Sequence, residues 1–348
     1  MTKWRDMFKK GLAVTRLLTK ALMGLGVALL LGVWGDGQEA SKPTPPSSNK
    51  TAGFPSGHEK QPPTPRQLVQ ASNACPEWGT LTLFKADVLQ RCIDEGLNPN
   101  AKIEKETLLT TVAGMSGQDA TEAVQVLLEA GADVNEQNGT SALMAASRAG
   151  HTATVQAVLD AGGNVNAQIN DPGNPIVHGL GAHGLTALIL ASDVGHTATV
   201  QALLDAGADP NLQNKAGFTA LMAASRAGHT ATVQAVLAVG ADLNLQSKAG
   251  FTALMGASRA GHTATVQALL DAGADVNVQI NDQNWKGQGW TALMLASAMG
   301  HTATVRALLD AGADPDLRDK RGATASDVAG GRDRTEIVRI IEKAAAFR

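Results

Sequence analysis

The chain has 348 residues, a formal net charge of −3 and an aromatic content of only 3%, with no tyrosine. After Gly35 it carries 23 basic and 31 acidic side chains, so it lacks the positive excess expected of a protein that binds nucleic acid. A core this poor in aromatic residues must be built from alanine, leucine and valine, which suits thin helices that stack closely.

The first 35 residues are typical of an export signal or a membrane anchor. Six Lys and Arg side chains lie between Lys3 and Lys20, and an uncharged run then covers residues 21–35. Its length of about 15 residues fits a signal-peptide core and falls short of the roughly 20 residues of a membrane-spanning helix. A cleaved signal, an uncleaved anchor over residues 12–35 and a buried soluble helix all stay open. The first two place the rest of the chain outside the cytoplasm, in the periplasm or secreted.

Residues 36–74 are rich in proline, serine and lysine and have few apolar residues, which predicts a disordered linker. Such a linker is either a tether between membrane and domain or a tail that remains after signal processing.

The chain has two cysteines, Cys75 and Cys92. An exported protein matures where disulfides persist, and an even number of cysteines predicts one bridge between them. Cys92 falls on the apolar face of a helix expected within residues 75–104, which we interpret as an N-terminal capping half-repeat. The bridge would contribute about 3 kcal/mol in the chain-entropy model. Two free cysteines are the alternative.

A repeated segment dominates the chain from residue 139 onward. Its histidines are separated by 45, 33, 33 and 39 residues, so the base period is 33, with insertions of 12 and 6 residues in two of the steps. A fixed period of this length predicts a solenoid, in which each unit needs its neighbours to bury its apolar face. The copies begin at Gly139, Gly184, Gly217, Gly250 and Gly289.

Each unit predicts two helices followed by an extended finger. Thr219 is positioned to cap a first helix of strong helix formers, and Gly228 supplies the left-handed residue that ends it. Thr230 is expected to cap the second helix, and Gly240 is expected to end it. The polar stretch 242–250 then forms the finger that leads to the next cap.

The segments GFTALMAAS, AGHTATVQALL and AGADVN resemble the ankyrin repeat, and they recur five times in register. The resemblance implies an all-α repeat solenoid of helix–turn–helix units with hairpin-like fingers, two of them lengthened by the insertions. It covers residues 105–348, as a diverged repeat at 105–137, five regular repeats at 138–320 and a C-terminal cap at 321–345.

The sequence departs from the ankyrin pattern at two positions of every regular repeat. Alanine replaces the family's proline, and an apolar residue replaces the histidine of its TPLH motif. The second change removes a Thr–His hydrogen bond and substitutes apolar packing, so we expect the fold to persist. The replacing residues are Met144, Ile189, Met222, Met255 and Met294.

The five histidines of the GHTATV segment suggest a metal site only at first sight. Neighbouring helices pack about 8–10 Å apart, whereas zinc needs each imidazole nitrogen about 2.0–2.1 Å away. We therefore expect structural histidines, no metal or other cofactor, and no catalysis. The alternative is a metal-dependent enzyme that uses the insertion 168–184, which contains Asp171, His178 and His183.

The resemblance also implies which residues contact a partner protein. One repeat position, between the finger glycine and the capping threonine, faces the concave side of ankyrin proteins and often contacts partners, as does a position late in the first helix. Here the two positions hold mostly aromatic residues and arginines, which dominate the energetics of interfaces. The alternative is that the rings pack against the adjacent finger. The predicted partner-binding residues are Leu185, Phe218, Phe251, Trp285, Trp290, Arg148, Arg226, Arg259, Lys215 and Lys248.

The two insertions begin alike, with VNAQIND at Val165 and VNVQIND at Val276. Each lengthens a finger, and two fingers of standard length lie between them. This outline suits a clamp around a protein partner, and a duplication of the segment without a role in binding is the alternative. A self-associating scaffold is the remaining alternative, and the sequence leaves the partner's identity and the oligomeric state open.

Overall fold

The computed structural model describes residues 84–103, 106–136, 141–169, 183–282 and 287–346. The chain divides into two units, Met1–Lys60 and Gln61–Arg348, and the described residues all belong to the second unit. The expected signal or anchor, the linker, Cys75 and Trp285 lie outside the described residues. Among the residues that are described, no helix is both long and apolar enough to cross a membrane.

After a single helix, α3 (Ala86–Asp94), the helices come in pairs of a first and a second helix. Two short strands, β1 (Lys102–Ile103) and β2 (Glu106–Thr107), pair antiparallel before the first of these pairs. The pairs are α4 (Leu108–Ala113) with α5 (Gln118–Glu129), α6 (Ala142–Ala149) with α7 (Thr152–Asp160), α8 (Ala187–Val194) with α9 (Thr197–Asp205), α10 (Ala220–Ala227) with α11 (Thr230–Ala238), α12 (Ala253–Ala260) with α13 (Thr263–Asp271), α14 (Ala292–Met299) with α15 (Thr302–Asp310), and α16 (Ala325–Gly330) with α17 (Thr335–Ala346).

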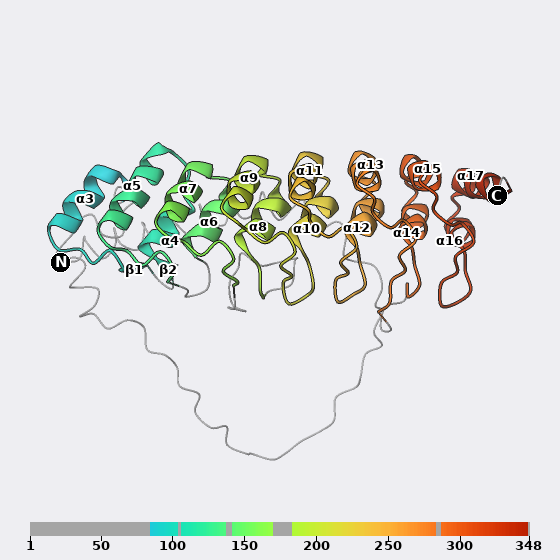
Figure 1. Cartoon of the computed structure of the whole chain (residues 1–348), viewed down its shortest axis with the longest axis horizontal. Helices are drawn as coiled ribbons and strands as arrows, with labels where there is room; N and C mark the ends of the chain where they lie inside the picture. The colour runs from blue at the N-terminus through green and yellow to red at the C-terminus, as the bar shows by residue number, and fades with distance from the viewer. Residues whose placement is uncertain (1–83, 104–105, 137–140, 170–182, 283–286, 347–348) are drawn as a thin grey trace, which may run out of the picture. The chain divides into compact units, whose positions relative to one another are not determined.

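The pairs stack so that first helices contact first helices and second helices contact second helices (Figure 1). Helix α8 packs against α6 and α10, while α9 packs against α7 and α11. Helix α3 contacts α5 and therefore lies in the row of second helices. The fingers extend from the row of first helices, on the side away from the second helices (Figure 1). This arrangement confirms the predicted all-α repeat solenoid.

Each regular first helix begins at a capping hydroxyl and ends at a left-handed glycine. In α10 the Thr219 hydroxyl accepts the backbone N–H of Met222 at 3.3 Å, and Gly228 follows the helix with a φ of 79°. A Cβ at Gly228 would be strained by this φ and would lie 2.6 Å from Nδ1 of His262 in the next repeat. The glycine therefore both ends the helix and makes room for a histidine ring, and both predicted termini of α10 are confirmed.

The second helices begin differently from the prediction. Thr230 is the first residue of α11, His229 precedes the helix, and no side chain caps it. The Thr230 hydroxyl instead bonds the Thr265 hydroxyl of the next repeat at 2.8 Å, and the same contact joins other neighbouring repeats. The predicted cap was wrong because this hydroxyl links repeats to each other.

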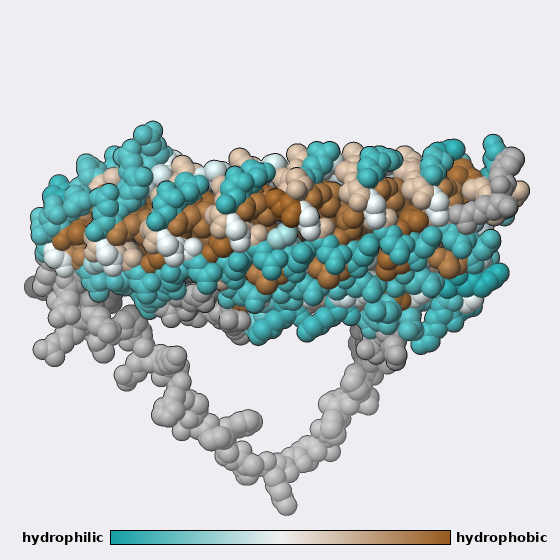
Figure 2. Space-filling view, in the orientation of Figure 1, coloured by the Kyte–Doolittle hydropathy of each residue, from teal (hydrophilic) through white to brown (hydrophobic). Residues whose placement is uncertain are grey.

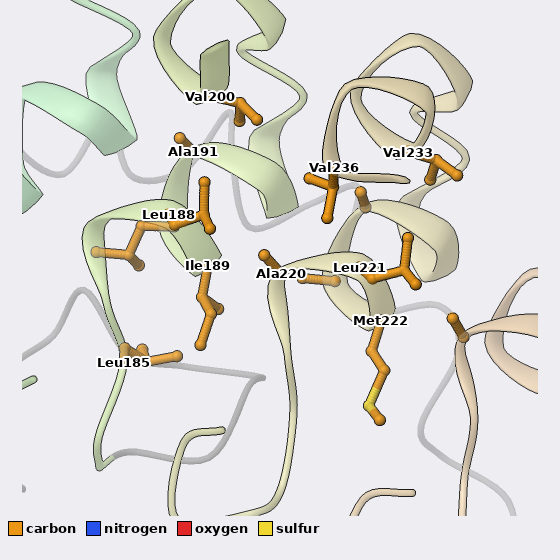
Figure 3. Close-up of a cluster of buried hydrophobic side chains, with 14 of the residues drawn as sticks. Leu185, Leu188, Ile189, Ala191, Val200, Ala220, Leu221, Met222, Val233 and Val236 are labelled. Atoms are coloured by element: carbon orange, nitrogen blue, oxygen red, sulfur yellow. The ribbon is translucent and has the colours of Figure 1, made fainter. Parts of the chain in front are cut away.

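The core is mainly apolar and extends on both sides of the row of first helices, toward the second helices and toward the fingers (Figure 3). Ile189 and Met222, which replace the histidine of the ankyrin pattern, are buried and leave their helices on the side away from the second helices (Figure 3). On the surface, apolar residues form a band bounded by polar residues of the second helices and of the fingers (Figure 2). Five serines at one position of the first helices are fully buried, and their hydroxyls have no hydrogen-bond partner: Ser147, Ser192, Ser225, Ser258 and Ser297.

Side-chain amides join consecutive repeats in the turns and the fingers. In the turn after a second helix, Asn211 Oδ1 accepts the backbone N–H of Asp242 in the next repeat at 2.8 Å. In the finger, Gln213 Nε2 donates to the Gly217 carbonyl at 2.8 Å and to the Gln246 carbonyl of the next repeat at 3.0 Å. The described parts of these fingers contain no strand, so the side-chain amides satisfy main-chain carbonyls that no sheet pairs.

Candidate partner-binding surface

A shallow hollow near the N-terminal end of the array shows which repeat positions share one face. It has a volume of about 390 Å³ and lies between the first helices α4 and α6. The equivalent positions in the other repeats form a surface along the array, and we call this surface the inner face. The lining residues are Glu106, Thr110, Thr111, Gly114, Met115, Ala145, Arg148 and Ala149.

In the regular repeats the inner face includes two adjacent positions at the end of the first helix. These first helices form one continuous surface, since a Cβ built at Gly256 of α12 would lie 3.6 Å from Cβ of Arg226 in α10. The first position holds Arg148, Asp193, Arg226, Arg259 and Ala298, and the second holds Ala149, Val194, Ala227, Ala260 and Met299.

The predicted basic residues lie on first helices and fingers. Arg148, Lys215 and Lys248 are exposed, while Arg226 and Arg259 are half-buried. Nη2 of Arg226 donates to Oδ1 of Asp193 in the preceding repeat at 2.8 Å, and the two side chains remain 37% and 30% exposed. An ion pair with this much solvent contact contributes at most about 1 kcal/mol to stability.

The residues predicted to bind a partner from the position before the capping threonine lie only partly on the surface. Leu185 is fully buried, and Trp290 is 8% exposed, with its indole N–H donating to Oδ2 of Asp319 at 3.1 Å. A buried side chain cannot contact a partner protein. The prediction that Leu185 and Trp290 belong to an accessible binding surface was therefore wrong.

The base of the long fingers explains this burial. The backbone N–H of Ile169 donates to the Leu185 carbonyl at 2.9 Å, and the second long finger makes the same bond at its own base. In a short finger the equivalent bond runs from the Asn214 N–H to the Phe218 carbonyl at 3.0 Å. Long and short fingers thus share one hairpin base, and the extra residues come between its two halves in the sequence. In the long fingers a buried isoleucine replaces the polar residue at this base.

Phe218 and Phe251 are half-buried and pack against the core. The Phe218 N–H donates to Oδ1 of Asn214 at 2.9 Å, and the Phe251 N–H donates to Oγ of Ser247 at 3.1 Å. The two rings therefore contribute to the core as well as to the surface. Part of each ring stays accessible, so their role in binding remains a prediction.

Asp319 occupies in the last short finger the position that Asn214 has in an earlier one. Burial raises the pKa of the Asp319 carboxyl. Four hydrogen bonds lower this pKa by more than burial raises it, and their donors are the backbone N–H groups of Ala323 and Arg321, the Trp290 indole and the Arg321 guanidinium. The pKa therefore lies below its ordinary value. The charged carboxylate closes the finger and accepts the indole N–H of the preceding repeat.

Comparison with protein families now identifies the repeat. A model of three ankyrin repeats matches residues 82–171, 117–214 and 188–280, and a model of a single ankyrin repeat matches residues 288–320. The chain belongs to the ankyrin-repeat family. Ankyrin repeats are generally protein–protein interaction modules. No curated protein matches this ankyrin-repeat chain.

Four of the five histidines of the GHTATV segment lie against backbone carbonyls. Nε2 of His196 is 3.1 Å from the Arg148 carbonyl, and Nε2 of His301 is 3.1 Å from the Arg259 carbonyl. Each ring thereby fixes the end of the first helix in the preceding repeat. In the part of the chain that the structure describes, no group of three or more His, Cys, Asp or Glu side chains could hold a metal ion. Asp171 and His178 of the first insertion lie outside that part.

The sequence reasoning missed two inner-face residues of the ankyrin array. Val194 and Met299 are 43% and 37% exposed, at a position that is alanine in the other regular repeats. Both repeats follow a long finger, and both also carry a leucine, Leu190 or Leu295, where the other first helices have alanine or glycine. Comparing the repeats with one another would have revealed this pattern from the sequence.

Proposed function

We propose that this ankyrin-repeat protein binds another protein through its inner face and the adjoining fingers, without catalysis. The observation that carries the proposal is the hollow between α4 and α6, which places the end of a finger and the ends of two first helices on one surface. At the equivalent positions of later repeats this surface presents Phe218, Phe251, Arg226 and Arg259. Aromatic and arginine side chains are the residue types that most often carry binding energy at interfaces.

Site-specific photo-crosslinking tests this proposal because it captures a bound protein whatever its identity. A photoreactive amino acid replaces Ala260, which is exposed on the inner face, or Ala272, which is also exposed, at the end of the second helix α13. In the native cell we expect a discrete adduct with a second protein from position 260 and none from position 272. Adducts of the same size and yield from both positions would show that the inner face has no special role. An adduct of twice the chain's mass would identify a self-associating scaffold instead.

We also propose that the array acts outside the cytoplasm. The support is the basic segment before residue 21 and the apolar run of residues 21–35. A protease-sensitive tag after residue 348 should be cleaved by protease added to cells whose inner membrane is intact. A tag that is cleaved only after that membrane is broken would contradict the proposal.

The predicted bridge between Cys75 and Cys92 belongs to the same proposal. Cys92 is buried in α3, and the described residues contain no free cysteine. In the mature protein, a thiol-reactive label should attach only after reduction. Labelling to the same extent before and after reduction would show two free cysteines.

A further inference from the structure

Charge is distributed unevenly around the array. Between residues 183 and 282 there are four Lys and Arg side chains, and all four lie in fingers or first helices: Lys215, Arg226, Lys248 and Arg259. Five of the seven Asp side chains in the same span lie at the ends of second helices or in the turns that follow: Asp205, Asp209, Asp242, Asp271 and Asp275. The finger and first-helix side is therefore basic although the chain as a whole is acidic.

The inner face also has a definite order from α8 to α14. It presents Val194 on α8, Arg226 on α10, Arg259 on α12 and Met299 on α14. Val194 and Met299 are substantially exposed, whereas the residues at their position in α10 and α12 are alanines. Along four consecutive first helices, these residues are therefore apolar on α8, basic on α10 and α12, and apolar on α14. We call Val194 and Met299 the apolar ends, and Lys215, Arg226, Lys248 and Arg259 the basic centre.

We infer that the inner face between α8 and α14 binds an acidic segment of a partner protein that has an apolar residue on each side of its acidic stretch. The inference rests on the proposed function and specifies the chemistry of the partner. Carboxylates complement the basic centre, and apolar side chains at both ends remove Val194 and Met299 from water. A nucleic acid would also match the charge of the basic centre, but it has no apolar side chains and would leave Val194 and Met299 exposed to water.

The spacing of the helices sets the length of the segment. Three intervals between first helices, at about 8–10 Å each, separate the apolar ends by about 24–30 Å. An extended chain rises about 3.3 Å per residue. A segment of about nine residues therefore reaches from one apolar end to the other.

Asp193 weakens the attraction of this site for carboxylates. Its carboxylate already accepts from Nη2 of Arg226 at 2.8 Å, so a partner carboxylate competes with it for the guanidinium. The variant Asp193→Asn removes the competing charge and should strengthen binding of an acidic segment. A residue that only stabilised the fold would give the opposite result or none.

Fluorescence anisotropy with the full chain tests the inference. The probe is a labelled nine-residue peptide with leucine at both ends, four glutamates between them and glycine or serine elsewhere. We expect saturable binding, at least ten-fold tighter than that of peptides with glutamine for glutamate or serine for leucine. The absence of saturable binding, or equal affinity for the glutamine peptide, would overturn the inference. So would tighter binding of a nine-nucleotide single-stranded DNA.

Variants of the protein locate the site. Arg226→Glu with Arg259→Glu should weaken peptide binding at least ten-fold, and Val194→Ser with Met299→Ser should abolish the preference for leucine ends. Arg306→Glu is the control for each single arginine variant, Arg226→Glu or Arg259→Glu, because it makes the same change of charge on the second helix α15, where the Arg306 side chain is 56% exposed. Its affinity should stay within two-fold of the unchanged protein. An equal loss in the control would show unspecific charge attraction and overturn the inference.

The two proposals fail separately. If crosslinks from position 260 capture a protein but the arginine variants leave that adduct unchanged, the inner face binds a partner that is not acidic and only this inference falls. If position 260 yields no adduct, the inner face is not the binding surface and the proposed function falls as well.

Discussion

Replacing Gly195 by alanine isolates the contact between a helix-ending glycine and the histidine of the next repeat. Gly195 ends α8 with a φ of 85°, and a Cβ built there would lie 2.5 Å from Nδ1 of His229. Gly207 has a φ of 84°, yet nothing lies within 4 Å of its Cβ position. The two glycines therefore share the same backbone strain and differ in their surroundings.

The expected losses of unfolding free energy follow from the backbone strain and from the contact with the His229 ring. Alanine in the left-handed region costs about 1–2 kcal/mol, and the smaller freedom of the unfolded chain offsets about 0.4–1 kcal/mol of it. Overpacking adds about 1–3 kcal/mol. The His229 ring cannot move aside without losing its contact with the Asp193 carbonyl, which lies 3.2 Å from Nε2. We expect Gly207→Ala to cost about 1 kcal/mol and Gly195→Ala about 2–4 kcal/mol.

Urea unfolding followed by circular dichroism measures both costs. In a His229→Ala background the additional cost of Gly195→Ala should disappear, because the ring that the new methyl group meets is gone. Equal costs for the two glycines, or an additional cost that persists without the ring, would refute the reasoning.

Three further predictions concern stability. Ser225→Ala should raise the free energy of unfolding by about 1 kcal/mol, since it removes a buried hydroxyl without a partner, whereas Ser247→Ala should lower it by a similar amount because that hydroxyl accepts the Phe251 N–H. A loss in both serine variants would show that the Ser225 hydroxyl is bonded. Phe218→Ala combined with Phe251→Ala should cost about 3–5 kcal/mol, roughly half the loss for two fully buried rings. An unchanged Tm would place the rings outside the core. Because the pKa of Asp319 is lower in the folded than in the unfolded protein, its contribution to stability is complete at neutral pH and is lost as pH falls below about 3.8. Asp319→Asn should therefore destabilise the protein at pH 7 and reduce the loss on acidification, and urea titrations that give both proteins the same pH profile would contradict this.

Features set within one repeat could be predicted from the sequence. Thr219 caps its helix and Gly228 ends it because each acts through its own backbone and the nearest turn. The solenoid follows from the period itself, since units that cannot bury an apolar face alone must stack. Because stacking holds the units together, replacing the histidine of the ankyrin pattern by Met222 leaves the helix in place and adds a buried side chain.

Features that depend on contacts across a hairpin or between repeats could not be predicted from one repeat. Leu185 and Phe218 occupy the same position, but Leu185 is buried at a hairpin base beside Ile169 while Phe218 is only half-buried. Thr230 has the right sequence context for a cap, yet its hydroxyl is used by the next repeat. The resemblance indicated which repeat positions to expect at a partner surface, and it could not indicate which of them the neighbouring residues cover.

The amide links between repeats have a consequence for how such a chain changes in evolution. The side-chain amides of Gln213 and Gln246 each donate to a carbonyl of their own finger and to a carbonyl of the next finger. Each repeat therefore offers an acceptor to the repeat before it and a donor to the repeat after it. Deleting or duplicating a unit of 33 residues between the two insertions rejoins equivalent edges and leaves no amide without its acceptor. Such an event would alter one quantity, the separation between the long fingers, in steps of a single helix spacing. The reach of the array can therefore be adjusted by recombination while the chemistry at its two ends stays unchanged.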